Sequence, residues 1–75
     1  MWRVTINCSA DSWSQYGDAF KAIAEKYHGT PISSKKMKDD QRRIMEYKLD
    51  DVSEAEEFVE ECLSLEGFTA FFESL

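Results

Sequence analysis

Apolar and polar residues follow the same pattern twice along this chain of 75 residues. In each copy, an alternating stretch leads to a stretch with helical spacing and then to another alternating stretch. The first copy covers about residues 2–38 and the second about residues 42–73. Because alternation is typical of strands and a spacing of three or four residues of helices, each copy predicts a strand, a helix and a strand.

The first copy opens with a predicted strand over residues 2–8, where every second residue is apolar. Ser12 is followed three residues later by Gln15, which is a capping-box pattern, so we expect the first helix to begin there. The apolar stripe of this helix consists of Trp13, Tyr16, Phe20, Ile23, Ala24 and Tyr27. We expect the backbone to pass close to the sheet at Gly17, and Gly29 to be the C′ residue before Pro31.

Residues 30–38 give the weakest strand pattern, because lysines and serines interrupt the apolar positions. Such residues are typical of edge strands, where they discourage pairing with another chain, so we place this strand at an edge of the sheet. Residues 39–41 form the turn that follows it.

The second copy begins with a central strand that alternates up to Leu49. Its helix opens within residues 50–53, where Ser53 with Glu56 and Asp51 with Glu54 are equally good capping boxes. The predicted buried stripe is Ala55, Phe58, Val59, Cys62 and Leu63.

Gly67 is predicted to end this second helix, and residues 68–72 predict the last strand. Phe71 points to the face opposite Phe68 and Phe72, and a C-terminal helical turn is an open alternative for the final residues. Two strand–helix–strand units in so short a chain predict an α+β, ferredoxin-like β-α-β-β-α-β domain over residues 1–75. Its four-stranded antiparallel sheet would carry both helices on one face. Since this fold hosts many activities, function must come from the surfaces.

Composition favours a small globular domain in the cytoplasm, or in the host cytoplasm if a phage encodes it. The chain is 43% hydrophobic, and no apolar run approaches the roughly 18 residues of a membrane span. The first ten residues lack the features of a signal peptide. Cys8 and Cys62 fall on apolar faces, where free cysteines act as small core residues. The sequence leaves open whether they form a disulfide.

Charge is distributed unevenly along the chain. The net charge of −6 argues against binding to nucleic acid or to an anionic membrane. Residues 1–29 are neutral and residues 30–49 carry six bases and three acids, whereas residues 50–75 carry nine acids and no base. The second half of the domain is therefore an acidic pole.

The outer face of the second helix is the main candidate site. Glu57 and Glu61 are one turn apart, as are Glu56 and Glu60, and neither pair has a basic neighbour within the helix. The structural interpretation is a solvated face that gives solubility. The functional interpretation is a surface that docks on a basic site of a partner protein and speeds association by steering. The residues proposed for it are Asp50, Asp51, Glu54, Glu57, Glu60 and Glu61.

A basic hairpin forms the opposite pole. It comprises Lys35, Lys36, Lys38, Arg42 and Arg43, and it is a protected edge, a second contact patch or surface for self-association, or a weak anion site. Ile44 and Phe71 would extend this patch if they lie together on the open face of the sheet. A homodimer that hides them is possible.

The residues on which other families with this fold depend are missing from this sequence. The loop after the first strand has one cysteine where a copper-chaperone-like domain has two, and no glycine or arginine for an acylphosphatase-like anion loop. The third strand places Tyr47 on the core side, which argues against an RNA-recognition motif. His28 is the only histidine, at a helix end where a cation is favoured. We expect no catalytic residue, metal or cofactor.

We therefore predict a small acidic, non-enzymatic binding protein that inhibits or modulates another protein. In size and charge it resembles the small inhibitors that phages make against host enzymes, anti-CRISPR and anti-restriction proteins among them. The alternative is a dimeric ACT-like regulatory module that binds a small molecule at the subunit interface, although the glycine-containing turn usual after the first strand is missing.

Overall fold

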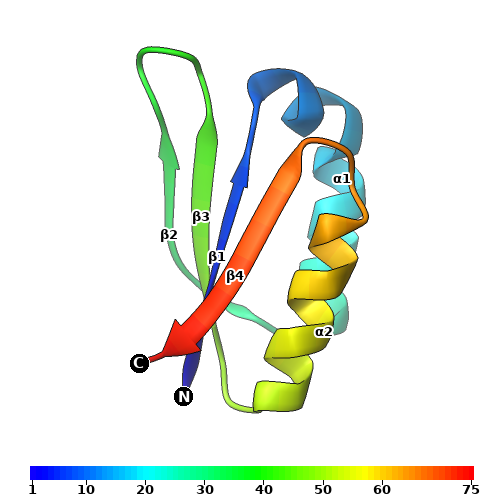
Figure 1. Ribbon diagram of the computed structural model, residues 1–75, viewed down its shortest axis with the longest axis vertical. Coiled ribbons are helices and arrows are strands. Elements are labelled where there is room, and N and C mark those ends of the chain that lie inside the picture. Colours follow the sequence, from blue (N-terminus) through cyan, green and yellow to red (C-terminus); the bar gives the residue numbers. More distant parts are fainter.

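The computed structural model describes residues 1–75 and has the predicted β-α-β-β-α-β order (Figure 1). The elements are β1 (Trp2–Cys8), α1 (Ala10–Lys26), β2 (Thr30–Lys36), β3 (Arg43–Leu49), α2 (Val52–Leu63) and β4 (Phe68–Ser74). All neighbouring strands are antiparallel, in the order β2-β3-β1-β4. Both helices cover the same face of the sheet (Figure 1). The ferredoxin-like fold is thereby confirmed, and so is the edge position of β2.

The core lies between the sheet and the two helices. The predicted alternation holds, since Val4, Ile6 and Cys8 of β1 are almost fully buried. The other buried apolar residues are Phe20, Ala24, Met45, Leu49, Ala55, Phe58, Cys62 and Phe68. The ring of Phe20 lies at the centre, with four other aromatic rings at centroid distances of 5.7–6.2 Å. Both cysteines are free, and no helix has the length and apolar character needed to span a membrane.

Both helices begin at a capping residue. The predicted start of α1 at Ser12 is wrong, because Ser9 is the N-cap and its hydroxyl accepts from the Ser12 backbone N–H at 3.1 Å. Helix α2 begins after Asp51, whose carboxylate accepts from the Ser53 N–H at 2.7 Å. Of the two N-cap candidates left open, Ser53 and Asp51, the structure therefore uses Asp51.

Helix α1 ends in a Schellman motif with an unexpected residue at C′. The His28 N–H donates to the Glu25 carbonyl at 3.2 Å, and the Gly29 N–H donates to the Ala24 carbonyl at 3.3 Å. His28, with φ +53°, is therefore the left-handed C′ residue, and the prediction of Gly29 is wrong by one position. Gly29 is closely packed, because a Cβ there would lie only 3.2 Å from the Tyr47 ring.

Three further predictions about individual residues need correction. Leu63 is 52% exposed, because it lies about 100° around the helix from the buried Cys62. Gly67 does not end α2, which stops at Leu63; it has φ +83° in the turn before β4. The nearest atoms to a Cβ on Gly17 would be those of Trp13 at 3.4 Å, not those of the sheet.

The chain ends in a strand and not in a helical turn. β4 runs from Phe68 to Ser74 and pairs with β1 along its whole length. Phe71 lies on the open face of the sheet, as predicted, and is 56% exposed.

Candidate protein-docking surfaces

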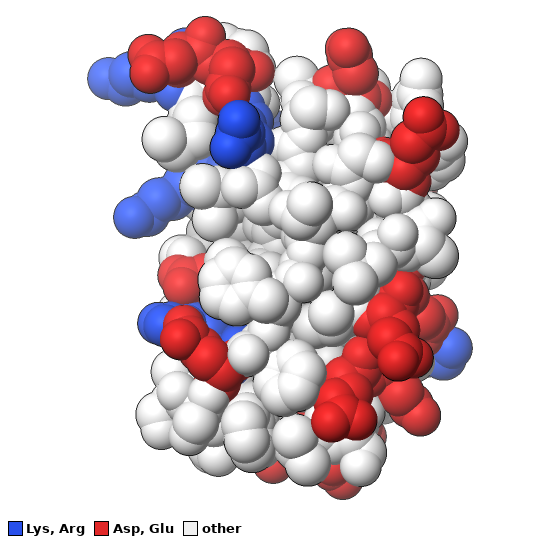
Figure 2. Space-filling view, in the orientation of Figure 1, with Lys and Arg blue, Asp and Glu red and all other residues white.

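The outer face of α2 carries the acidic side chains predicted to contact a partner. Ala55, Phe58 and Cys62 are buried and define the side of the helix that faces the sheet. At 100° per residue, Glu57 and Glu60 fall on the opposite side. Figure 2 shows acidic side chains gathered over α2.

Most of these acids have no basic partner within the chain. Of the nine acids in residues 50–75, only Glu61 and Glu73 form ion pairs. The other seven are exposed: Asp50, Asp51, Glu54, Glu56, Glu57, Glu60 and Glu66. Asp51 has a structural task as the N-cap of α2. The carboxylates of Glu54, Glu57 and Glu60 are therefore exposed and free to pair with a partner's lysines and arginines.

Glu61 is different, because it faces α1. Its carboxylate accepts a hydrogen bond from the Tyr27 hydroxyl and lies 3.1 Å from Lys26 Nζ. The Tyr27 hydrogen bond, and after it Lys26, lowers the pKa of Glu61. The same contact with Glu61 raises the pKa of Lys26 and of Tyr27. Helical spacing alone could not reveal this contact, since the partners come from different helices. Glu61 joins the two helices and is a weaker candidate for binding than its neighbours.

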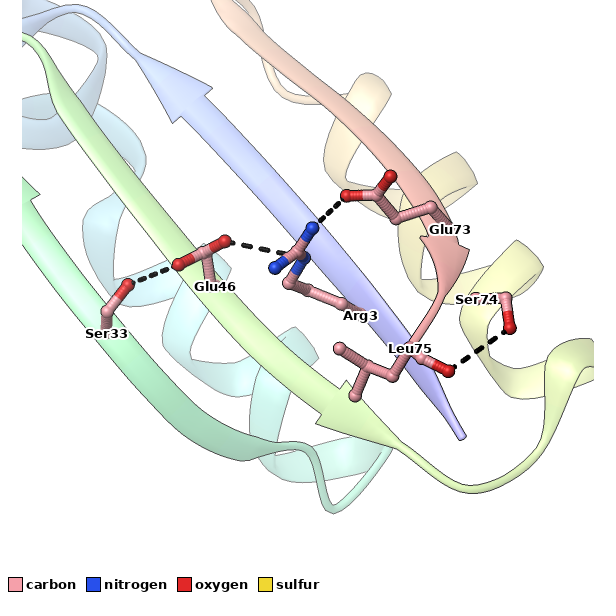
Figure 3. Close-up of polar contacts among 6 residues, drawn as sticks. All are labelled: Arg3, Ser33, Glu46, Glu73, Ser74 and Leu75. Carbon is pink, nitrogen blue, oxygen red and sulfur yellow. Dashed lines mark hydrogen bonds and ion pairs between the residues drawn. The ribbon is translucent and has the colours of Figure 1, made fainter.

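The open face of the sheet has a charge ladder that sequence reasoning missed (Figure 3). Arg3 on β1 lies between Glu46 on β3 and Glu73 on β4, with its Nε 3.5 Å from Glu46 and an ion pair to Glu73. The Ser33 hydroxyl on β2 donates to Glu46 at 2.7 Å. The hydrogen bond to Glu73 is the main reason that the pKa of Arg3 is raised. All four strands are thus cross-linked by side chains on this face.

The predicted apolar patch on this face is divided. Ile44 lies opposite Asn7 on β1, and Phe71 lies opposite Thr5. Since β1 runs between β3 and β4, polar side chains separate the two apolar ones. Ile44 is half-buried, whereas Phe71 is exposed.

The basic residues of the hairpin do not form one patch either. Lys35 pairs with Ile44 on the open face, whereas Lys36 pairs with Arg43 on the helix side. The guanidinium of Arg43 stacks 4.6 Å from a ring centroid of Trp13, and Arg42 forms an ion pair with Asp40 at 3.1 Å. The four cations therefore point in different directions.

One groove opens where α1 ends and β2 begins. Its volume is about 680 Å³, and it is wide open to solvent. The lining residues are Lys21, Ala24, Glu25, His28, Gly29, Pro31 and Tyr47. No group of three or more His, Cys, Asp or Glu side chains converges as metal ligands would.

Comparison with known proteins shows the fold but no family. No protein-family model matches the chain, and no curated protein matches its sequence. Among solved structures, it is similar to part of a formyltetrahydrofolate deformylase from Pseudomonas putida KT2440, with a TM-score of 0.58 and 12% sequence identity. The match covers 99% of this chain and 28% of the deformylase chain. At this identity the similarity concerns the fold alone.

Proposed function

We propose that this protein is a binding module that inhibits or modulates another protein by docking the outer face of α2 on a basic surface. The observation that carries this proposal is the set of exposed, unpaired carboxylates at Glu54, Glu57 and Glu60. By contrast, Glu46, Glu61 and Glu73 each have a basic partner. Like charges on neighbouring turns cost a few tenths of a kcal/mol per pair, and a basic partner would offset that cost.

The proposed role is inhibition of the partner protein in the cytoplasm. This role is favoured by the small size and acidity that the chain shares with phage inhibitors, including anti-CRISPR proteins. A rigid acidic helix can occupy a basic site that otherwise binds phosphates. Rim charges act mainly on the association rate, so binding should weaken as salt rises.

The test is capture of a partner from lysate with wild type and two charge-reversal variants. The first variant replaces Glu54, Glu57 and Glu60 by lysine and leaves Glu61 in contact with α1. The second variant replaces Asp18, Glu25 and Glu66 by lysine. These are exposed acids outside this face, so the second variant has the same net charge as the first. We expect a single protein that wild type and the second variant retain, that salt releases, and that the first variant loses. A partner held equally by both variants would contradict the proposal.

A second candidate function is the small-molecule module. The groove beside His28 and Tyr47 favours it, since this is a concave site with charged and aromatic walls. The groove lies between α1 and β2, at the edge of the sheet opposite β4. A screen of small charged metabolites by thermal shift, repeated with Lys21→Glu, tests it. Stabilisation that persists in this variant would exclude the groove.

A further inference from the structure

The two edges of the sheet differ in how well they are protected against pairing. Edge strand β2 contains Pro31, a register shift directly after it, and the lysines 35 and 36. All of these hinder the approach of another strand. Edge strand β4 contains no proline or lysine, and its one charged residue, Glu73, pairs with Arg3. β4 is therefore the edge on which a further strand can add.

The backbone of β4 also presents free donors and acceptors at this edge. The Leu75 N–H donates to the Met1 carbonyl at 3.1 Å, so these residues form a hydrogen-bonded pair of the β1–β4 ladder. In antiparallel ladders such pairs alternate, so every second residue counted back from Leu75 bonds to β1. Ala70 and Phe72 lie between them, and their N–H and C=O groups point away from the sheet.

Exposed apolar side chains concentrate around this edge. Of the seven large exposed ones, Met1, Phe71 and Leu75 lie on β4 or at its end, and Val52 and Leu63 lie on α2, which packs against β4. By helical geometry, Val52 and Leu63 lie on the flank of α2 opposite Glu61, which faces α1. Figure 2, viewed with β4 in front as in Figure 1, shows an uncharged strip along the long axis with charged side chains at its margins.

We propose that β4 pairs antiparallel with β4 of a second copy about a two-fold axis at Phe71. Phe71 is the midpoint of Phe68–Ser74, so this register pairs all seven residues of the strand. Ala70 faces Phe72 of the second copy, which matches a small side chain with a large one and forms about four backbone hydrogen bonds. The two Phe71 side chains meet at a non-hydrogen-bonded position, where side chains are closest.

The helix layer fits the same arrangement. Because α2 packs on β4 and β1, the two copies of α2 would lie two strand spacings apart. That is about 10 Å, the distance at which helices pack. Val52 and Leu63 of each copy would be covered.

Two observations favour a second copy over a different partner. The pairing strand is self-complementary in length and in alternation of side-chain size, as a two-fold interface requires. Glu56 is the acid nearest to Val52 and Leu63 on this flank of α2, and Glu73 of β4 is paired with Arg3, so the repulsion comes mainly from Glu56. Glu57 and Glu60 stay exposed in the dimer. Dimerisation through β4 therefore does not depend on docking of the acidic face.

Salt distinguishes this interface from acidic-face docking. We expect sedimentation equilibrium to show a dimer that salt strengthens, since screening reduces the repulsion between the Glu56 side chains.

Point variants test which residues hold the dimer together. Phe71→Lys should abolish the dimer. Ala70→Pro should do so too, because it removes an outward N–H and no bond to β1. Ile32→Lys on β2, which also replaces an exposed apolar side chain, should leave the dimer intact. A wild type that remains monomeric up to about 1 mM would overturn the proposal.

Cysteine cross-linking tests the register, with circular dichroism to establish that each variant is folded. Phe71→Cys places two thiols opposite each other at the axis, so mild oxidation should give a covalent dimer. In the matched control, Thr69→Cys, the two Cα atoms lie about 13 Å or more apart, which is too far for a disulfide. The native cysteines are buried. Equal cross-linking of both variants would contradict the register and with it the proposal.

Discussion

The hydroxyl of Ser12 lies where a side chain on Gly67 would have to go. Ser12 is in the first turn of α1 and Gly67 is in the turn before β4, so the two copies of the repeated pattern meet here. A Cβ on Gly67 would overlap Ser12 Oγ and lie 3.0 Å from Ser12 Cβ. The backbone of Gly67 is also left-handed, with φ +83°.

Gly67→Ala should therefore lower the free energy of unfolding by about 2–4 kcal/mol, from left-handed strain and overpacking together. Urea denaturation measures this change. Gly17→Ala is the matched control, because Gly17 is helical and a Cβ there makes only ordinary contact with Trp13 at 3.4 Å. It should raise stability by up to about 1 kcal/mol. Effects of the same sign in both variants would contradict this explanation.

The C′ position of α1 offers a stabilising change. His28 has a left-handed backbone, which costs about 1–2 kcal/mol for a residue with a Cβ. His28→Gly should raise the midpoint of thermal unfolding. Glycine makes the unfolded chain more flexible and so offsets part of the relieved strain, which leaves a gain of about 1 kcal/mol in the free energy of unfolding. His28→Ala keeps the Cβ and should give no such gain. If both variants gained equally, the imidazole and not the backbone would be the cause.

The Glu61 contact should make stability depend on pH. The pKa of Glu61 is lowered from its usual 4.5, so its ionised form stabilises the fold above that pH. Glu61→Gln should lose less than about 1 kcal/mol at neutral pH, because the site is partly exposed. The difference from wild type should disappear as pH falls through the folded pKa. Glu57→Gln, which removes an unpaired carboxylate, should lose no stability. A loss for Glu61→Gln that is the same at low pH would count against the contact.

The two thiols should be inert in the folded protein. Burial, and to a lesser degree Glu61, raises the pKa of Cys62 to about 12, and burial also raises the pKa of Cys8. Since the thiolate is the reactive form, a disulfide reagent should modify both cysteines slowly until denaturant is added. Rapid labelling of either cysteine under native conditions would contradict their burial.

The fold could be predicted because its pattern is local. Alternation in β1 and β3 and helical spacing in α2 each reflect one buried face, which the chain encodes residue by residue. The errors lie at ends and contacts. Ser12 looked like an N-cap from its spacing to Gln15, but Ser9 caps the helix, and the Ser12 hydroxyl accepts from the Ser9 hydroxyl and lies close to the turn of Gly67. That contact joins residues 55 positions apart, so no local pattern contains it.

The candidate surfaces were predicted less well, for the same reason. Charge segregation identified the acidic face, and Glu57 and Glu60 are exposed there as expected. The sequence could not tell that Glu61 turns to Lys26 on the other helix. The hairpin cations were also predicted to form one patch, although alternation along β2 and β3 places them on opposite faces of the sheet. The free edge at β4 became apparent only once the strand order was known.

The most direct test of acidic-face docking is the salt dependence of the dissociation constant for the captured partner. It should be measured from about 50 to about 300 mM salt, with wild type and with the variant carrying lysine at residues 54, 57 and 60. Wild-type affinity should fall steeply with salt, and the variant should bind weakly with little salt dependence. The same affinity and the same salt slope in both proteins would contradict it, and the acids of α2 would then serve solubility.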